Sequence, residues 1–366
     1  MARTANVLVQ PRQPQARARE AAAVAAPGAP SLLSGWPALL LAVIVAGAAV
    51  YSFSHRPLPP FPQTVTKADG LLVTGLAQSG ERRIAVGELG RILIADAASG
   101  PWREVKVTPQ RGSTFTRVIF TDANTAIAVG HDGWIVRSTD RGETWHEVVF
   151  DPERGEAVLG VAGPFDGRLY AYGAFGQFLV STDNGQTWLH EKHGAIGDRH
   201  LAAMVQAQDG SLVIVGETGL MARSVDQGAS WTKLPEVYKG SFYGLQRLPS
   251  DTLLAFGMRG NAYLSDDNGQ HWTRSNVPGG LSLYDSMIDH DGHVVLVGEN
   301  SSVFRSTDNG RTFSMLLEGD RKRYATVLPV SNGSGWLVAG EAGIALRKAP
   351  GELAAADANT AKDVQR

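Results

Sequence analysis

The sequence contains no cysteine, which excludes disulfide bonds and thiolate metal sites. It also has no excess of either charge, with 34 lysine and arginine residues against 36 aspartate and glutamate residues. A chain with this balance produces no overall field that would attract nucleic acid, so we expect no nucleic-acid partner. The absence of cysteine agrees with an exported protein that avoids wrong disulfide pairing, although many cytosolic proteins also lack cysteine.

The familiar catalytic and metal-binding motifs are missing as well. The chain has neither a Gly-x-Ser-x-Gly elbow nor a phosphate-binding P-loop string. Its nine histidines are scattered, and His190, His193 and His200 do not have the spacing of a metal-binding motif. The sequence therefore predicts no catalytic residue, no metal ligand and no cofactor.

Charged residues are absent from a long segment near the N-terminus, residues 32–53, which contains the strongly apolar run 38–50. About 20 apolar residues span a bilayer as a helix, so we expect a transmembrane helix over 32–53. The preceding residues 1–31 form a basic tail without periodicity, which we expect to be disordered. The positive-inside rule places this tail in the cytoplasm and the rest of the chain across the cytoplasmic membrane, in the periplasm.

A cleavable signal peptide is the alternative to this membrane anchor, because Ala46-Gly47-Ala48 has the form of a cleavage site. We favour the anchor, since 31 preceding residues are many for a signal peptide and the apolar run continues past this site. Either interpretation exports the rest of the chain. The proline-rich residues 54–60 then form an extended linker between the membrane and the following domain.

An eight-residue motif, Ser-x-Asp-x-Gly-x-x-Trp, recurs through the remainder of the chain. Its copies are residues 138–145, 181–188, 224–231, 265–272 and 306–313, the last of which closes with Phe313. A decayed sixth copy ends at Trp102. The closing aromatic residues follow one another at intervals of 41 or 43 residues, and a fixed period near 40 indicates a repeat architecture.

A second pattern, Gly-x-x-Gly, lies upstream of each motif and brings the number of units to seven. Each unit contains four short β-branched or aromatic runs, named A to D, which in the second unit are residues 115–120, 125–130, 134–138 and 144–150. Four antiparallel strands in each of seven repeats are typical of an all-β, seven-bladed β-propeller. A solenoid is disfavoured because no repeat resembles a polar cap.

The two ends of the repeat region complement each other, and we assign residues 61–350 to the propeller. The seventh unit has A, B and C runs but no D run, whereas the spare segment 61–66 precedes the first unit. We expect this segment to supply the missing fourth strand, so that the two ends of the chain share one blade. The polar, alanine-rich residues 351–366 are expected to be disordered.

The repeated motif falls at the turn between C and D, where its residue types suit a structural role. The aspartate carboxylate accepts hydrogen bonds from the backbone of its own turn, the glycine adopts positive φ, and the closing aromatic packs between blades. A calcium loop at 266–269 is excluded, since the required acidic residue twelve positions after the first ligand is missing. The residues assigned to this structural role are Asp140, Trp145, Asp183, Trp188, Asp226, Trp231, Asp267, Trp272, Asp308 and Phe313.

This motif is known as the Asp box or BNR repeat, which sialidases, sortilin-type receptors and photosystem II stability/assembly factors share. The longer string at 128–145, AVGHDGWIVRSTDRGETW, resembles the assembly factors most, and the resemblance covers residues 61–350. It implies a non-enzymatic, seven-bladed propeller outside the cytoplasmic membrane that helps to assemble membrane-protein complexes. Relatives in non-photosynthetic bacteria are associated with RND-type transporters, so the implied partner is a membrane complex of this kind. The predicted membrane anchor departs from the family's thylakoid-targeting or lipoprotein signals.

A sialidase-like propeller that binds or cleaves glycans is the alternative. Sialidases resemble the chain in their boxes but also carry an Arg-Ile-Pro motif, three arginines and a Tyr/Glu nucleophile pair, and no Arg-Ile-Pro string occurs here. Tyr324, after the basic run 321–323, has the chemistry of a nucleophile, but a core-facing tyrosine behind a solvated loop is the better interpretation. We therefore expect no enzymatic activity.

The geometry of a propeller indicates which loops would recognise a partner. The boxes share one face with the A–B turns, while the D–A connectors and B–C turns form the opposite face around the channel mouth. Variable loops on a rigid scaffold concentrate recognition, and tyrosine and arginine are enriched at interaction hot spots. For any single residue, an ordinary solvated loop explains the sequence equally well. The candidates are Arg117, Arg199, His200, Lys239, Tyr243, Tyr284, Arg321, Arg323 and Tyr324, opposed by Glu88, Glu217, Glu299 and Glu341.

Overall fold

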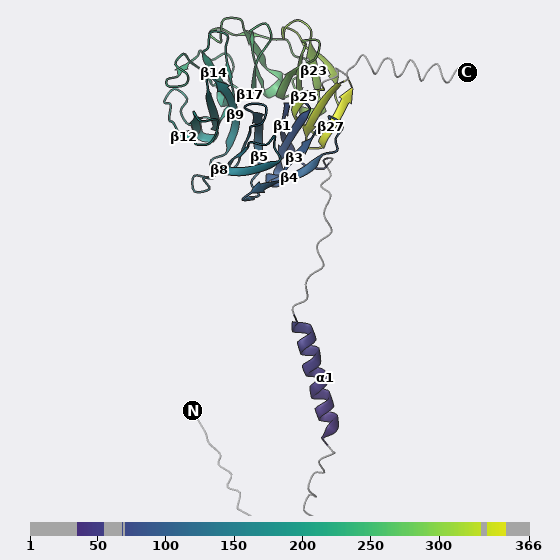
Figure 1. The fold of residues 1–366 in the computed structure, drawn as a ribbon. Coiled ribbons are helices and arrows are strands. Elements are labelled where there is room, and N and C mark those ends of the chain that lie inside the picture. The colour runs from purple at the N-terminus through teal and green to yellow at the C-terminus, as the bar shows by residue number, and fades with distance from the viewer. Residues whose placement is uncertain (1–34, 55–67, 69, 331–334, 349–366) are drawn as a thin grey trace, which may run out of the picture. The chain divides into compact units, whose positions relative to one another are not determined.

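The structure is a computed structural model that describes residues 35–54, 68, 70–330 and 335–348 (Figure 1). The chain divides into two units, residues 1–64 and 65–366, which we treat separately. The predicted tails 1–31 and 351–366 and the linker residues 55–60 lie outside the described residues.

The first unit contains one helix, α1 (Trp36–Phe53), which has a proline in its first turn and no buried residue. Proline suits this position because its missing N–H has no helical partner there. With 18 residues and a mean hydropathy of 2.0, the helix is long and apolar enough to cross a membrane. A signal sequence near the N-terminus would meet the same criteria. The helix lies within the predicted span 32–53, of which residues 32–34 are not described.

The described part of the second unit forms six sheets, of which the eight-stranded one comprises two blades. The resulting seven blades, each antiparallel within itself, confirm the predicted all-β propeller. Blade 1 comprises β1 (Val73–Ser79), β2 (Arg82–Gly87), β3 (Ile92–Ala95) and β4 (Arg103–Thr108). Blade 2 comprises β5 (Phe115–Phe120), β6 (Ala126–Gly130), β7 (Ile135–Ser138) and β8 (Thr144–Val149). Blade 3 comprises β9 (Val158–Phe165), β10 (Arg168–Gly173), β11 (Phe178–Ser181) and β12 (Leu189–His190). Blade 4 comprises β13 (Leu201–Gln206), β14 (Leu212–Gly216), β15 (Met221–Ser224) and β16 (Thr232–Lys233).

The remaining blades follow the same order, and the described residues of the last one form three strands. Blade 5 comprises β17 (Phe242–Arg247), β18 (Leu253–Gly257), β19 (Ala262–Ser265) and β20 (Thr273–Arg274). Blade 6 comprises β21 (Leu283–Ile288), β22 (Val294–Gly298), β23 (Val303–Ser306) and β24 (Ser314–Leu317). Blade 7 comprises β25 (Tyr324–Pro329), β26 (Gly335–Gly340) and β27 (Gly343–Lys348). A parallel pairing between β4 and β8 additionally joins the outer strands of blades 1 and 2.

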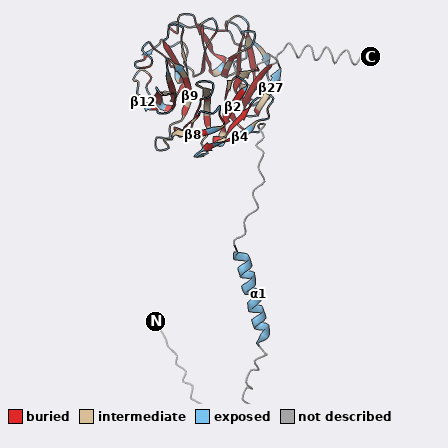
Figure 2. Ribbon diagram, in the orientation of Figure 1, coloured by how far each residue is buried: buried red, intermediate tan, exposed pale blue. Residues whose placement is uncertain are grey.

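The blades form a closed ring. Each A strand contacts the A strand of the next blade, and β25 returns to β1. Seven apolar clusters fill the seven interfaces between neighbouring blades, including the one that joins blade 7 to blade 1. The buried residues accordingly follow the strands of the propeller (Figure 2). The core is therefore distributed between blades and not concentrated within any one of them.

The outer edge of blade 7 meets the chain that leads into blade 1. The predicted fourth strand, residues 61–66, lies outside the described residues. Ala68 is described, and its carbonyl oxygen accepts a hydrogen bond of 3.2 Å from the backbone N–H of Ile344, at the start of β27. The entry to the first blade thus reaches the outer edge of the last.

The Asp box at residues 181–188 shows how the repeat is held. One carboxylate oxygen of Asp183 accepts from the backbone N–H of Thr187 at 2.9 Å, and the other accepts from the Thr187 hydroxyl at 2.6 Å. Ser181 donates to the same carboxylate and accepts from the backbone N–H of Gly185. Asn184 and Gly185 both have positive φ, 57° and 80°, so the turn needs two consecutive left-handed residues where the sequence predicted one.

The closing aromatic residue of each box packs against the preceding blade. Trp145 is fully buried in the interface of blades 1 and 2, and its indole N–H donates to the Gly142 carbonyl at 3.0 Å. Trp188, Trp231 and Phe313 are buried in the corresponding interfaces of later blades, while Trp272 is partly buried. Trp102, from the decayed copy, is only half-buried against the interface of blades 7 and 1.

We predict that Trp145→Ala lowers the free energy of unfolding by about 3–5 kcal/mol, since it empties a fully buried site. Trp102→Ala should cost clearly less, because its side chain is already partly solvated. Urea unfolding followed by circular dichroism would measure both. Equal losses from the two variants would contradict the assigned packing.

Acid should weaken the boxes. Hydrogen bonds from Thr187 lower the pKa of Asp183 from 3.8 to about 2, and Ser230 does the same for Asp226. A depressed pKa contributes stability that is present above about pH 4 and is lost as the pH falls through 2. Asp183→Asn should therefore lower the melting temperature at pH 7 and flatten its decline between pH 4 and 2. A melting curve series over this range would test it, and an unchanged acid slope would contradict it.

Candidate functional site

Hydrogen bonds between turns define the two faces of the propeller. The backbone N–H of Glu88, in the first B–C turn, donates to the carbonyl of Leu72, just before β1. The same bond recurs in later blades, so the B–C turns and D–A connectors form one face, which we call the mouth face. On the opposite side, Asn184 of a box donates to Asp122 in an A–B turn at 2.9 Å. We call this the box face.

A β-bulge recurs at the same place in all seven A strands. In each blade the pairing of the A strand with the B strand shifts so that the second residue of the A strand has no partner. Bulges redirect side chains and are frequent beside functional sites. All seven unpaired residues line one hollow of about 490 Å³, which we call the mouth cup. They are Thr74, Thr116, Leu159, Ala202, Tyr243, Tyr284 and Ala325.

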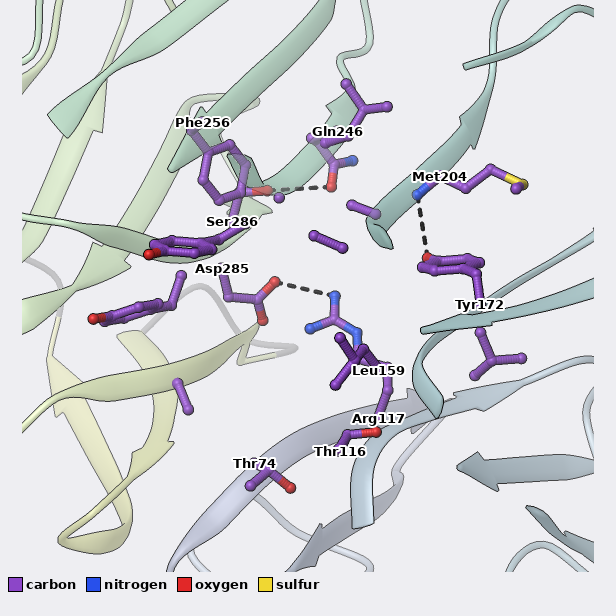
Figure 3. Close-up of a pocket in the computed structure, with 18 of the residues that line it drawn as sticks. Thr74, Thr116, Arg117, Leu159, Tyr172, Met204, Gln246, Phe256, Asp285 and Ser286 are labelled. Atoms are coloured by element: carbon purple, nitrogen blue, oxygen red, sulfur yellow. Dashed lines mark hydrogen bonds and ion pairs between the residues drawn. The ribbon is translucent and has the colours of Figure 1, made fainter. Parts of the chain in front are cut away.

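An ion pair crosses the floor of the mouth cup (Figure 3). Arg117 of β5 and Asp285 of β21 each follow a bulge, and Nη2 of the arginine lies 3.3 Å from Oδ1 of the aspartate. The second carboxylate oxygen of Asp285 accepts from the backbone N–H of Val327 at 3.1 Å. The Asp285 carboxylate raises the pKa of Arg117 above its ordinary value, so this guanidinium stays charged. The pair connects blades 2, 6 and 7.

Aromatic rings fill the floor beside the ion pair, because two A strands carry glycine after the bulge. A Cβ atom at Gly160 would lie 2.4 Å from the ring of Tyr172, and one at Gly244 would lie 2.1 Å from the ring of Phe256. The Tyr172 hydroxyl accepts from the backbone N–H of Met204 at 3.1 Å, as Figure 3 shows. Burial raises the pKa of Tyr172 to about 12, so the phenol remains neutral.

One wall of the mouth cup is a ladder of stacked side chains from three neighbouring blades. The rings of Tyr243 and Tyr284 lie 5.5 Å apart with 27° between their planes, and the guanidinium carbon of Arg323 lies 6.0 Å from the Tyr284 ring centre. Burial and the nearby Glu299 carboxylate raise the pKa of both tyrosines. Arg323 also pairs with Glu341 at 3.0 Å.

The opposite wall is built from smaller residues. Thr74 donates its hydroxyl to the carbonyl of Phe115, and Thr116 donates to the carbonyl of Val158, each at 2.6 Å. These bonds tie neighbouring A strands together. The mouth cup is therefore asymmetric, with the Tyr243–Tyr284–Arg323 ladder over blades 5 to 7.

The structure brings four of the predicted binding residues into the mouth cup, namely Arg117, Tyr243, Tyr284 and Arg323. Four others lie in or at the end of the surrounding D–A connectors. The ring centres of His200 and Phe175 lie 5.0 Å apart. The backbone carbonyl of Arg199 accepts a hydrogen bond from a backbone N–H. Lys239 and Arg321 are exposed.

Tyr324 is not on the mouth face. It is 3% exposed and packs in the apolar interface of blades 6 and 7, where its hydroxyl accepts from Nε of Arg347 at 2.9 Å. It occupies the first position of its A strand, which points into the core in every blade. Tyr324 is therefore not a binding residue of the mouth face. It is a core-facing tyrosine, as the alternative interpretation of the sequence had it.

The acidic residues of the B–C turns have a local structural task. Carboxylate oxygens of Glu88, Glu299 and Glu341 accept backbone N–H groups just before the A strands, at Leu72, Ser282 and Arg323. They hold the connectors in place. The sequence interpretation treated them only as charges facing the basic connectors.

Asp285 was missed at the sequence level, although an alignment of the A strands would have revealed it. The residue after the bulge is small in most blades, so opposite charges at this position stand out. In chain order the seven residues are Gly75, Arg117, Gly160, Ala203, Gly244, Asp285 and Thr326.

Among the described residues, Asp289, Asp291 and His293 are the only histidine and carboxylate group close enough to hold a metal ion. They lie in the A–B turn of blade 6, on the box face. Nη2 of Arg305 lies 3.0 Å from Asp289 and 3.2 Å from Asp291, so a guanidinium already supplies the positive charge there.

Loss of one member of the floor ion pair should be costly. We expect Arg117→Met or Asp285→Asn alone to lower the unfolding free energy by about 1–3 kcal/mol, since the first leaves a largely buried carboxylate unpaired and the second a partly buried guanidinium. The half-exposed arginine keeps the value at the lower end. The double variant should lose about 1 kcal/mol less than the sum. Urea unfolding at pH 7 would test this, and strict additivity would contradict it.

Comparison with known proteins places the chain among propellers at the level of the fold. No protein-family model matches the sequence. A xyloglucanase from Hypocrea jecorina (strain QM6a) is 27% identical over 111 residues, which is 27% of this chain and 13% of that enzyme. The chain thus matches only a small part of this curated relative.

Solved structures match most of the chain. A structure of YCF48 bound to D1 peptide has a TM-score of 0.62 and 18% identity, covering 81% of this chain and 98% of that one. YCF48 from Cyanidioschyzon merolae has a TM-score of 0.61 and 16% identity, and the match covers 78% of this chain and 98% of that one. A streptogramin B lyase has a TM-score of 0.64 and 13% identity, and the match covers 77% of this chain and 96% of that one. At these identities the similarity shows the β-propeller fold that YCF48 and this chain share.

Proposed function

We propose that the protein is a non-catalytic docking propeller that helps a membrane-protein complex to assemble. Its mouth face carries the proposal, because irregular connectors there surround a cup with a Tyr243–Tyr284–Arg323 ladder. Tyrosine and arginine dominate binding energy at protein interfaces, whereas the regular box face is engaged in holding the blades. The partner docks on the connectors around this ladder.

The comparisons support docking as the function. The structure of a fold relative, YCF48, is described as bound to a D1 peptide, so a propeller of this architecture binds a polypeptide. The Asp-box resemblance adds the class of partner, a membrane complex of the RND transporter type. The xyloglucanase match covers too little of either chain to support catalysis.

The proposed location follows from α1. Its side chains are apolar on all sides and none is buried, which suits a lipid-facing helix and not a surface helix of a domain. With the basic residues 1–31 in the cytoplasm, α1 anchors the protein in the cytoplasmic membrane and the propeller works in the periplasm.

The mouth cup also lacks the machinery of a glycosidase. Such enzymes use two carboxylates on either side of the scissile bond. Among the described residues that line the cup, Asp285 is the one carboxylate, and both of its oxygens already accept hydrogen bonds.

Affinity purification of the full-length protein from detergent-solubilised membranes tests the proposal. We expect a membrane complex to be recovered with the wild-type protein. Arg321→Glu/Arg323→Glu should reduce its recovery about tenfold or more, since charge reversal at a docking face introduces repulsion. The melting temperature should change little, because Arg321 is exposed and the ion pair of the half-exposed Arg323 with Glu341 is screened by solvent.

Arg274→Glu/Arg311→Glu provides the matched control, as it reverses two exposed arginines outside the mouth face. Recovery with this variant should equal that of the wild type. The proposal is wrong if no membrane protein is recovered, or if both double variants reduce recovery to the same extent.

A further inference from the structure

We propose that the mouth cup binds one ring of an uncharged saccharide, which stacks on Tyr243 as the next rung of the side-chain ladder. This small-ligand site goes beyond the docking of a membrane complex and does not depend on it. Three features of the cup favour such a ligand, namely a vacant stacking position, the pairing of its charges and the free donors of Arg117.

The vacant position lies beside Tyr243 on the side of blade 4. The ring of Tyr284 stacks on that of Tyr243, and Arg323 lies over the Tyr284 ring. On its other side, β17 contacts β13 of blade 4, where the bulge residue is Ala202 and the next residue is Ala203. Both alanines line the cup and are partly exposed, so they leave room for a further ring.

The charges of the mouth cup cancel in pairs. Arg117 pairs with Asp285, and Arg323 pairs with Glu341. Glu299, the carboxylate nearest the tyrosines, accepts the backbone N–H of Ser282 at 2.8 Å. A backbone N–H leaves the negative charge of Glu299 in place, and both arginines already have a carboxylate partner. The surroundings of the tyrosines therefore disfavour an anion, and a polar, uncharged ligand is favoured.

The hydrogen-bond donors of Arg117 distinguish a saccharide from an inserted aromatic side chain. Among the described residues, Arg117 donates only to Asp285, although a guanidinium has five N–H donors. Its side chain is 40% exposed, so water satisfies the others. An inserted phenylalanine would displace that water without replacing its hydrogen bonds, which is costly. A sugar ring offers an apolar C–H face to Tyr243 and hydroxyl groups to Arg117.

The size of the cup and its polar rim agree with this ligand. A volume of about 490 Å³ is ordinary for a small-molecule site and accommodates one or two sugar rings. Gln246 and Ser286 also line the cup, where the Ser286 hydroxyl donates to Oε1 of Gln246 at 3.4 Å (Figure 3), and they add polar groups that sugar hydroxyls can reach. Since Asp285 is the one carboxylate among the described residues that line the cup, we expect binding without cleavage.

Isothermal titration calorimetry on the full-length protein in detergent tests the inference. The neutral probes are cellotetraose and N,N′,N″,N‴-tetraacetylchitotetraose, and the charged probe is tetragalacturonate. We expect at least one neutral probe to bind with a Kd of about 1 mM or tighter. The charged probe should bind at least about fivefold more weakly than the better neutral one.

Four variants locate the ligand. Ala202→Phe should fill the vacant rung and abolish binding, while Tyr243→Ala should weaken it at least about fivefold. Tyr243→Phe keeps the ring and should bind within about threefold of the wild type. Ala229→Phe adds the same bulk to an exposed box-face residue and should bind as the wild type does.

The inference is overturned if neither neutral probe binds, if tetragalacturonate binds more tightly, or if Ala202→Phe binds as well as Ala229→Phe. Cleavage of a probe, detected by chromatography, would overturn binding without catalysis. Thermal melting of each variant excludes unfolding as the cause of a loss. Recovery of a membrane complex by Ala202→Phe without saccharide binding would show that docking and the saccharide site are separate.

Discussion

Each blade of this propeller buries its apolar side chains against its two neighbouring blades. This constraint explains why the ring is closed and why each Asp box places an aromatic residue between blades. A single blade has no core of its own, so stability requires all seven interfaces. The Asp box meets the requirement locally, because its carboxylate holds a left-handed turn that places Trp145 and its equivalents in the preceding interface. Stability is thus a property of the closed ring, as in other repeat architectures whose units contact only their neighbours.

The same regularity leaves the mouth face free to vary. Boxes and A–B turns are joined by repeated hydrogen bonds on one side, whereas the connectors on the other side are held to the B–C turns by bonds that differ from blade to blade. The repeated bulge then delivers one side chain per blade to the channel mouth without disturbing the sheets. The bulge position is the same in all seven A strands, but the residue type at this position differs between blades. Aromatic residues at two neighbouring bulge positions make one wall of the mouth cup distinct.

Local chemistry explains which features the sequence predicted. The spacing of Trp145 and its counterparts reports the period of the fold, so the blade count and the strands of blade 2 were predicted to within a residue or so. Arg117 and the two tyrosines were placed near the mouth from the strand order alone. Asp285 could not be paired with Arg117 in this way, because a contact across the ring joins residues 168 positions apart. Tyr324 was misplaced because adjacent A-strand positions alternate between core and channel, and one residue of register decides between them.

The floor ion pair has a consequence for anything that occupies the mouth cup. Arg117 of blade 2 and Asp285 of blade 6 meet across the ring, so an occupant of the cup lies on the mouth-face side of this pair. A protein docked on the mouth face would therefore cover a ligand bound in the cup. A ligand that is already bound would form part of the surface that the docked protein contacts.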